Sequence, residues 1–172
     1  LAGLERMRTA LRTEFTRAFP AALVEEPALV GTTARALRLR LRPDAPRQIL
    51  LNGHYDTVYE ADDPFQTCSR PAADTLRGPG VADMKGGLVV LLAARQAFEQ
   101  TLGASPLGWE ILLTPDEETG SHGSAPLFVE AAGRHTFALV FEPARPSGDI
   151  VQSRKGTGSF TATCCGRAAH AA

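Results

Sequence analysis

With 172 residues, of which 44% are hydrophobic and 22% charged, the chain is long enough for one domain with its own core and has a globular composition. Its net charge of −1 gives no electrostatic reason to expect a nucleic acid or a membrane surface as a partner. The longest apolar run, residues 88–94, is far shorter than the roughly 18 residues that a membrane-spanning helix requires. Length and charge therefore argue against nucleic-acid-binding and membrane proteins.

The three cysteines indicate a reducing compartment. Cys68, Cys164 and Cys165 lack CxxC spacing, so we expect free thiols and a cytoplasmic protein rather than disulfides or a cysteine zinc site. The chain begins at Leu1 rather than at Met and ends at Ala172, directly after a Gly–His segment. We therefore interpret it as a piece of a longer protein, in which any export signal would lie upstream.

In the first half of the chain we expect a helix, two strands and a long loop. Apolar residues at helical spacing open the chain: Leu4, Met7, Leu11, Phe15 and Ala18. Leucines alternate with arginines over residues 37–42, which predicts a half-exposed strand whose arginines lie on a solvated face. The continuous apolar run 49–51 predicts a buried strand. Residues 60–77 are polar and predict a surface loop near the functional site.

The second half alternates between helices and strands. We expect a helix over 84–100 with Leu88, Leu91, Leu92 and Phe98 as buried candidates, and buried strands over 109–114 and 137–141. Between these strands, Ser124 can cap a helix that Gly133 ends. This alternation predicts an α/β fold with a mainly parallel sheet flanked by helices. After Pro143 we expect two further strands, 150–154 and 158–165, the second entering another domain.

Five short motifs carry the side chains that suggest chemistry. They are GHYDTV at 53–58, GPGVADMKGG at 78–87, PDEETGS at 115–121, FEP at 141–143 and AAH at 168–170. From the first four we select one histidine and five carboxylates: His54, Asp56, Asp83, Glu117, Glu118 and Glu142. Side chains of these kinds bind hard or borderline metal ions and support hydrolytic chemistry.

The motifs follow the predicted strands at matching places. In an open α/β sheet the ligand crevice lies outside the carboxyl ends of the strands, so three strand ends would bring these side chains to one edge. Each motif alone is explained as well by a capped strand end, a solvated loop or a tight turn, but four together are not. Crowded carboxylates repel one another, and a cation would relieve that repulsion. We therefore expect zinc, with manganese or cobalt as substitutes.

The spacing within the motifs suggests a division of labour. His54 and Asp56 are two residues apart on an extended strand and share a face, so Asp56 can accept the free ring N–H of a metal-binding histidine. The adjacent Glu117 and Glu118 point in different directions, so that one can bind metal while the other serves as general base.

Five further charged or histidine side chains do not fit this pattern. We interpret His122 and His135 as surface residues and Lys85 as covering the start of a helix. Arg154, like Lys155 beside it, is either an ordinary surface charge or part of an anion site.

In this order and spacing, the motifs resemble those of the zinc-dependent exopeptidase and deacylase family. Members include glutamate carboxypeptidase (carboxypeptidase G), acetylornithine deacetylase, succinyl-diaminopimelate desuccinylase, aminoacylase and the cytosolic dipeptidases. The resemblance extends from Gln48 to the C-terminus. It implies a catalytic domain with two zinc ions, here residues 1–153, interrupted by a smaller α+β dimerisation domain that would begin at 154–172. It also implies a homodimer for the full-length protein.

The resemblance assigns a role to each motif residue. His54 would bind the first zinc with Asp56 as its orienting partner, and Asp83 would bridge both ions next to a cis peptide bond with Met84. The remaining roles are Glu117 as general base, Glu118 on the second zinc, Glu142 on the first zinc, and His170 and Arg154 toward the substrate. The family's last metal ligand is a histidine beyond this C-terminus, so the chain alone is expected to be inactive.

Two functional hypotheses follow from these motifs. The first is a two-zinc hydrolase that cleaves a C-terminal peptide bond or an N-acyl amino acid amide. Within it, the SRKGTGSF stretch at 153–160 resembles the glutamate carboxypeptidases, with a deacylase or desuccinylase as the alternative. The second is a non-catalytic metal-binding or interaction domain that has kept the fold. Glu117 separates the two, because a domain without catalysis has little use for a base beside the ligands.

Overall fold

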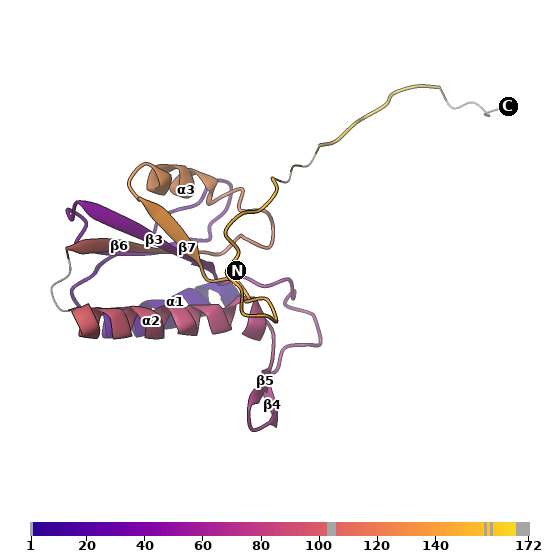
Figure 1. Ribbon diagram of the computed structural model, residues 1–172. Helices are drawn as coiled ribbons and strands as arrows, with labels where there is room; N and C mark the ends of the chain where they lie inside the picture. Colours follow the sequence, from indigo (N-terminus) through magenta and orange to yellow (C-terminus); the bar gives the residue numbers. More distant parts are fainter. Residues whose placement is uncertain (1, 103–105, 157, 159, 168–172) are drawn as a thin grey trace.

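The computed structural model describes residues 2–102, 106–156, 158 and 160–167, and its centre is a five-stranded sheet with the strand order β1-β2-β6-β3-β7 (Figure 1). The strands are β1 Leu23–Glu25, β2 Leu37–Leu41, β3 Arg47–His54, β6 Leu107–Thr114 and β7 Phe137–Val140. β3 is parallel to both of its neighbours, β6 and β7, whereas β2 is antiparallel to β6 and to β1. The parallel centre confirms the predicted α/β class.

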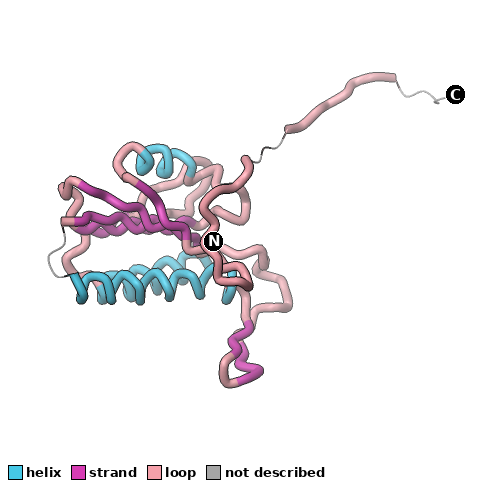
Figure 2. The backbone as a smooth tube through the Cα atoms, viewed as in Figure 1, coloured by secondary structure: helices cyan, strands magenta, loops and turns pink. Residues whose placement is uncertain are grey.

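Helices cover both faces of this sheet. They are α1 Ala2–Ala18, α2 Gly86–Leu102 and α3 Ala125–Ala132. α1 and α2 lie together on one face and α3 lies on the other (Figure 1; Figure 2). The larger apolar cluster, which includes Phe15, Leu91 and Trp109, joins α1 and α2 to the sheet, and a smaller one lies beneath α3. None of the described helices is long and apolar enough to span a membrane.

The arginine face of β2 is not solvated as predicted. Arg38 is only 6% exposed, and its guanidinium lies 3.1 Å from carboxylate oxygens of both Glu110 and Glu130. The alternation correctly separates the leucines from Arg38, but α3 covers the face on which Arg38 lies. His135 is also wrongly predicted to lie at the surface: its side chain is 4% exposed, with Nε2 3.6 Å from a Glu110 oxygen.

β7 is a strand but not a buried one. All four of its residues are exposed, with Phe137 at 53% and Val140 at 58%. The strand pairs with β3 along one edge, and no other described strand pairs with it. An apolar run therefore predicted the conformation correctly and the burial wrongly, because burial depends on neighbours that the run itself does not specify.

The segments outside the main sheet follow the prediction only in part. Residues 60–77 are largely exposed, as expected, but contain a hairpin of β4 Ser69–Ala72 and β5 Thr75–Arg77 that projects from the domain (Figure 2). The strands expected over 150–154 and 158–165 do not form in the described residues of those ranges. A single extended segment without a pairing partner has no ladder to stabilise it. The domain boundary at 153/154 stays a prediction. The three cysteines are free thiols.

Candidate metal centre

The carboxyl ends of β3, β6 and β7 meet at one edge of the sheet, on the right in Figure 1. His54 is the last residue of β3 and pairs in register with Thr114, the last of β6. Glu117 and Glu118 follow β6 by a few residues, and Glu142 follows β7 by two. The topology thus delivers side chains from three separate strands to the same place, as the general rule for open α/β sheets requires.

The ring nitrogen Nε2 of His54 is the point on which the carboxylates converge. It lies 3.0 Å from Asp83 Oδ1, 3.6 Å from Glu142 Oε1 and 4.0 Å from Glu117 Oε2. His54, Asp83 and Glu118 each offer a ligand atom within 4.8 Å of the others. The structure therefore brings together all five side chains for which the sequence predicted metal binding or base catalysis.

Asp56 holds His54 and the Glu118 backbone in place next to this cluster. Its Oδ1 lies 3.2 Å from His54 Nδ1, and its Oδ2 accepts a 2.9 Å hydrogen bond from the backbone N–H of Glu118. With Asp56 only 7% exposed, one carboxylate joins the end of β3 to the loop after β6. An Nδ1–H held by Asp56 leaves the Nε2 lone pair directed at the carboxylates, which is the tautomer that a metal-binding histidine needs.

Asp83 comes from a tight turn rather than from a helix. The turn spans Val81–Lys85 and α2 begins only at Gly86, two residues later than predicted. Gly80 adopts a left-handed φ of 63°, and a Cβ there would lie 2.5 Å from the Thr57 side chain. The Asp83–Met84 peptide bond is cis, as the family resemblance implies.

Lys85 lies at the start of α2, as predicted. Its Nζ donates to the Pro79 carbonyl oxygen at 2.7 Å, and burial lowers its pKa.

The loop that carries Glu117 and Glu118 is held by Asp116, a residue that the sequence motifs did not single out. Its Oδ2 accepts 2.9 Å hydrogen bonds from the backbone N–H groups of Gly123 and Ser124, which precede α3. Ser124 is the N-cap residue as predicted, but its side chain makes no capping hydrogen bond. An aspartate upstream of a helix start was the signal that could have found it, because its carboxylate can accept free N–H groups there.

The histidine and the carboxylates of the cluster shift one another's pKa values. Burial alone would lower the pKa of His54, but the hydrogen bond and charge of Asp56, the charge of Glu142 and the hydrogen bond with Asp83 raise it to about 9. Burial and then neighbouring carboxylates raise the pKa of Glu118 and of Glu142. Among the described residues, no lysine or arginine forms an ion pair with these carboxylates. A proton on His54 is the only positive charge that the cluster itself can supply.

The donor set fits a divalent metal ion. One oriented imidazole nitrogen and three or four carboxylates can be ligands for zinc, and the same set accommodates manganese or cobalt. A bound cation would replace the proton on His54 and reverse the upward shifts in the carboxylate pKa values.

Of the two residues predicted to contact substrate, only Arg154 is described, and it is not part of this cluster. Arg154 is exposed in a segment without regular structure, and no contact with the metal cluster is found for it within the described residues. His170 lies outside the described residues. His122 is exposed, as predicted.

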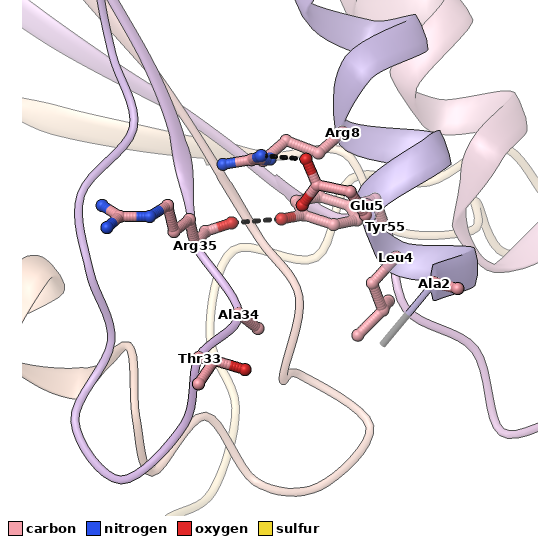
Figure 3. A pocket seen from close by; sticks show the side chains of 8 residues that line it. All are labelled: Ala2, Leu4, Glu5, Arg8, Thr33, Ala34, Arg35 and Tyr55. Atoms are coloured by element: carbon pink, nitrogen blue, oxygen red, sulfur yellow. Dashed lines mark hydrogen bonds and ion pairs between the residues drawn. The ribbon is translucent and has the colours of Figure 1, made fainter.

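A cavity of about 230 Å³ lies between α1 and residues 33–35 (Figure 3). Tyr55 reaches it from the strand end that carries His54, and its hydroxyl donates a hydrogen bond to the Arg35 carbonyl oxygen. Arg8 from α1 forms ion pairs with Glu5 and Glu26 beside it. Burial raises the pKa of Tyr55, which the Arg8 charge opposes, so the hydroxyl stays a donor. These contacts join Tyr55, next to His54, to Arg35, and α1 to Glu26.

The chain is similar in sequence to a curated carboxypeptidase and a curated desuccinylase. Carboxypeptidase G2 from Pseudomonas sp. (strain RS-16) is 30% identical over 158 residues, which are 91% of this chain and 36% of that protein. Succinyl-diaminopimelate desuccinylase 2 from Shewanella loihica is 34% identical over 142 residues, 75% of this chain and 37% of that protein. The chain therefore spans little more than a third of the length of these relatives.

Solved structures share the fold at lower identity. The M20 family metallo-carboxypeptidase from Sulfolobus solfataricus matches 85% of this chain and 34% of its own with a TM-score of 0.65 and 17% identity. The model of Peptidase family M20/M25/M40 matches residues 50–163, a range that contains His54, Asp83, Glu118 and Glu142. The chain belongs to this peptidase family.

Proposed function

We propose that this chain supplies most of the metal-binding part of a two-zinc hydrolase that cleaves a peptide bond or an N-acyl amino acid amide, most like a glutamate carboxypeptidase. The observation that carries the proposal is the convergence of Asp83, Glu117 and Glu142 within 4.0 Å of one His54 ring nitrogen. Family membership and the similarity to carboxypeptidase G2 support it.

In this proposal the ligands divide between two ions. His54, Asp83 and Glu142 would hold the first, and Asp83 and Glu118 would hold the second, with Asp83 shared between them. Asp56 keeps His54 in the tautomer whose Nε2 faces the cluster. Zinc suits this mixture of nitrogen and oxygen donors, and cobalt or manganese would substitute.

Glu117 acts as the general base. Zinc ions bound here would polarise the scissile carbonyl and lower the pKa of a water molecule. The Glu117 carboxylate takes a proton from the attacking water while the water oxygen forms a bond to the carbonyl carbon. The same carboxyl then gives that proton to the amide nitrogen as the carbon–nitrogen bond breaks, which releases an acid and an amine. Its side chain is 48% exposed, so a water molecule and a substrate can reach it.

Substrate binding and assembly complete the proposal for the whole protein. Arg154 and His170 would contact the substrate's carboxylate or carbonyl, residues 154–172 would begin the inserted domain, and the full-length protein would be a cytoplasmic homodimer. The alternative substrate class is N-acyl amino acids, as the name of the related desuccinylase suggests. A non-catalytic metal-binding domain is the alternative from another class.

An assay of the full-length protein separates these candidates. With zinc added, we expect release of glutamate from N-acylated glutamates and glutamyl peptides at a higher kcat/KM than deacylation of N-acetyl or N-succinyl amino acids. A preference for the latter would favour the deacylase. The non-catalytic domain would be favoured if the protein binds zinc but turns over neither the glutamate substrates nor the N-acyl amino acids. In that case the Glu117→Gln variant should bind zinc as the unsubstituted protein does and should also show no turnover. Glu14→Gln, an exposed change on α1, is the matched control.

A further inference from the structure

The backbone N–H of His54 lies at a position where the sheet offers it no partner. Peptide groups alternate along a strand, and the next N–H, that of Tyr55, donates to Thr114 at the end of β6. The His54 N–H therefore points toward β7. Pairing with β7 ends at Asn52, whose carbonyl accepts from Phe141, and β7 has no residue level with His54.

Met84 supplies the missing acceptor. Its Sδ lies 3.0 Å from the His54 nitrogen, and its side chain is fully buried. A Cβ at Gly53 would lie 2.8 Å from the Met84 methyl carbon and 2.7 Å from Leu88, so glycine at this position makes room for the thioether. A buried N–H without an acceptor costs about 1–3 kcal/mol. The thioether is a weak acceptor that brings no further polar group needing a partner.

Two consecutive residues thus hold His54 at two different points. Asp83 contacts the ring nitrogen Nε2 at 3.0 Å, and Met84 accepts from the backbone nitrogen at 3.0 Å. Both belong to the turn Val81–Lys85, which therefore cannot shift along β3 without breaking one of these contacts.

We propose that Met84 is a positioning residue of the metal centre, whose thioether sulfur accepts the backbone N–H of His54 and so keeps the imidazole of His54 and the carboxylate of Asp83 at ligand distance. The metal-affinity consequence rests on the proposed function, whereas the hydrogen bond itself does not. The role belongs to the sulfur as an acceptor, and not only to the volume that the side chain fills.

Replacement of the sulfur alone tests the proposal. The sequence contains two methionines, so a Met7→Leu background leaves position 84 as its one methionine, which can be replaced by selenomethionine or norleucine during expression. Norleucine keeps the shape of the methionine side chain but has no sulfur to accept the hydrogen bond, whereas selenomethionine keeps both the shape and an acceptor atom. We expect norleucine to weaken zinc binding at least about tenfold, in the range for lost partners of metal ligands. Selenomethionine should stay within about twofold of methionine.

A second measurement uses metal-free protein. The amide proton resonance of His54 should move upfield in the norleucine protein and stay in place with selenomethionine, because it reports the hydrogen bond directly. If norleucine prevents folding, scalar coupling between selenium at position 84 and the His54 amide proton decides instead. The matched control places norleucine at position 7 in a Met84→Leu background, where it should leave the zinc affinity of that background unchanged.

The outcomes separate the two proposals. An unchanged His54 amide resonance with norleucine, or the absence of selenium coupling in folded protein, overturns the acceptor role, even if zinc binding weakens. Unchanged zinc affinity with a shifted amide resonance overturns the positioning role. If the unsubstituted protein binds no zinc at all, the proposed function fails, while the amide resonance still decides whether the hydrogen bond exists.

Discussion

At the scale of single residues, His54 is held at three points before any metal binds. Asp56 contacts Nδ1, Asp83 contacts Nε2, and Met84 accepts from the backbone nitrogen. The histidine side chain is 1% exposed, whereas those of Asp83 and Glu117 are about half exposed. A fixed, buried nitrogen next to more accessible carboxylates is an arrangement in which the ligands can adjust to a metal while the imidazole stays in place.

The two adjacent glutamates should be separable by mutation in the full-length protein. Glu117→Gln should lower turnover by at least about a hundredfold, because an amide cannot act as base, and general base catalysis contributes on that order. Its zinc content should stay near normal, since Glu118 still carries a carboxylate. Glu118→Ala should instead lose about one zinc. The test is to measure the zinc content and the turnover rate of both variants. Equal loss of metal in the two variants would contradict the assigned roles.

Stability of the metal-free chain should fall as the pH rises above neutrality. The pKa of His54 is raised from 6.5 to about 9 in the folded state, so folding takes up a proton in this range. The stabilisation is complete below pH 6.5 and is lost as the pH passes 9, with a size on the order of a few kcal/mol. The free energy of unfolding, measured with urea at several pH values in the presence of a metal chelator, tests this prediction. A His54→Asn variant should lack this decline, and an equal decline in that variant would refute the assignment to His54.

At the scale of elements, the loop after β6 links the metal centre to α3. Asp116 accepts from Gly123 and Ser124, and the Gly123 carbonyl oxygen accepts from Val30. A Cβ at Gly123 would lie 2.9 Å from the Val30 carbonyl oxygen, so no other residue fits there without movement. The position of Glu117 and Glu118 therefore depends on how α3 begins.

Asp116→Ala should destabilise the chain by about 1–2 kcal/mol, the range for a lost helix cap, and should also weaken zinc binding. The second effect arises because the glutamate loop loses its closing hydrogen bonds. Asp116→Asn keeps an oxygen acceptor and should restore most of both properties. Asp62→Ala, at an exposed position, is the control. Lost stability with unchanged zinc affinity would show that α3 and the metal centre are independent.

The face of β2 beneath α3 carries a buried ionic network. Glu110 is 1% exposed and lies 3.1 Å from Arg38 Nε and 2.9 Å from Arg134. Glu110→Ala should cost up to about 3–5 kcal/mol, the range for breaking a buried ion pair. Arg38 and Arg134 would lose their buried carboxylate partner and keep only more exposed ones, of which both contact Glu130. Glu14→Ala, in an exposed pair with Arg17, should cost less than about 1 kcal/mol. Similar midpoints of urea unfolding for the two variants would show that the network contributes little.

At the scale of the whole molecule, the sequence predicted which side chains converge at the sheet edge better than it predicted the burial of the elements. His54, Glu118 and Glu142 were predictable because ligand-type residues follow apolar strands, and parallel strands end at a common edge. The burial of Arg38 was not predictable from the sequence, because its partner Glu130 is 92 residues away in the chain. Met84 was missed for a related reason: it accepts from a backbone N–H whose direction depends on the fold, and no side-chain pattern records that direction. Asp116 was missed although it precedes a helix start, where a carboxylate can accept free N–H groups.

The chain as a whole should bind one zinc ion much more tightly than a second. His54, Asp83 and Glu142 offer three ligands for the first, and three protein ligands with water complete an open zinc site. Only Asp83 and Glu118 remain for the second, which must also bind beside an existing divalent charge. Calorimetric titration of the metal-free chain should therefore show one strong step and one weak or absent step.

Mutation identifies the residues behind each step of this titration. His54→Asn should abolish the strong step, and Glu142→Ala should weaken it, whereas Glu118→Ala should remove only the weak one. Glu118 also has a ligand atom within 4.8 Å of those of His54 and Asp83, so loss of the strong step in Glu118→Ala would show that this carboxylate serves the first ion. Two equally tight steps would require another ligand in the chain. His122, an exposed histidine that follows the glutamate loop closely, is the first residue to replace in that case.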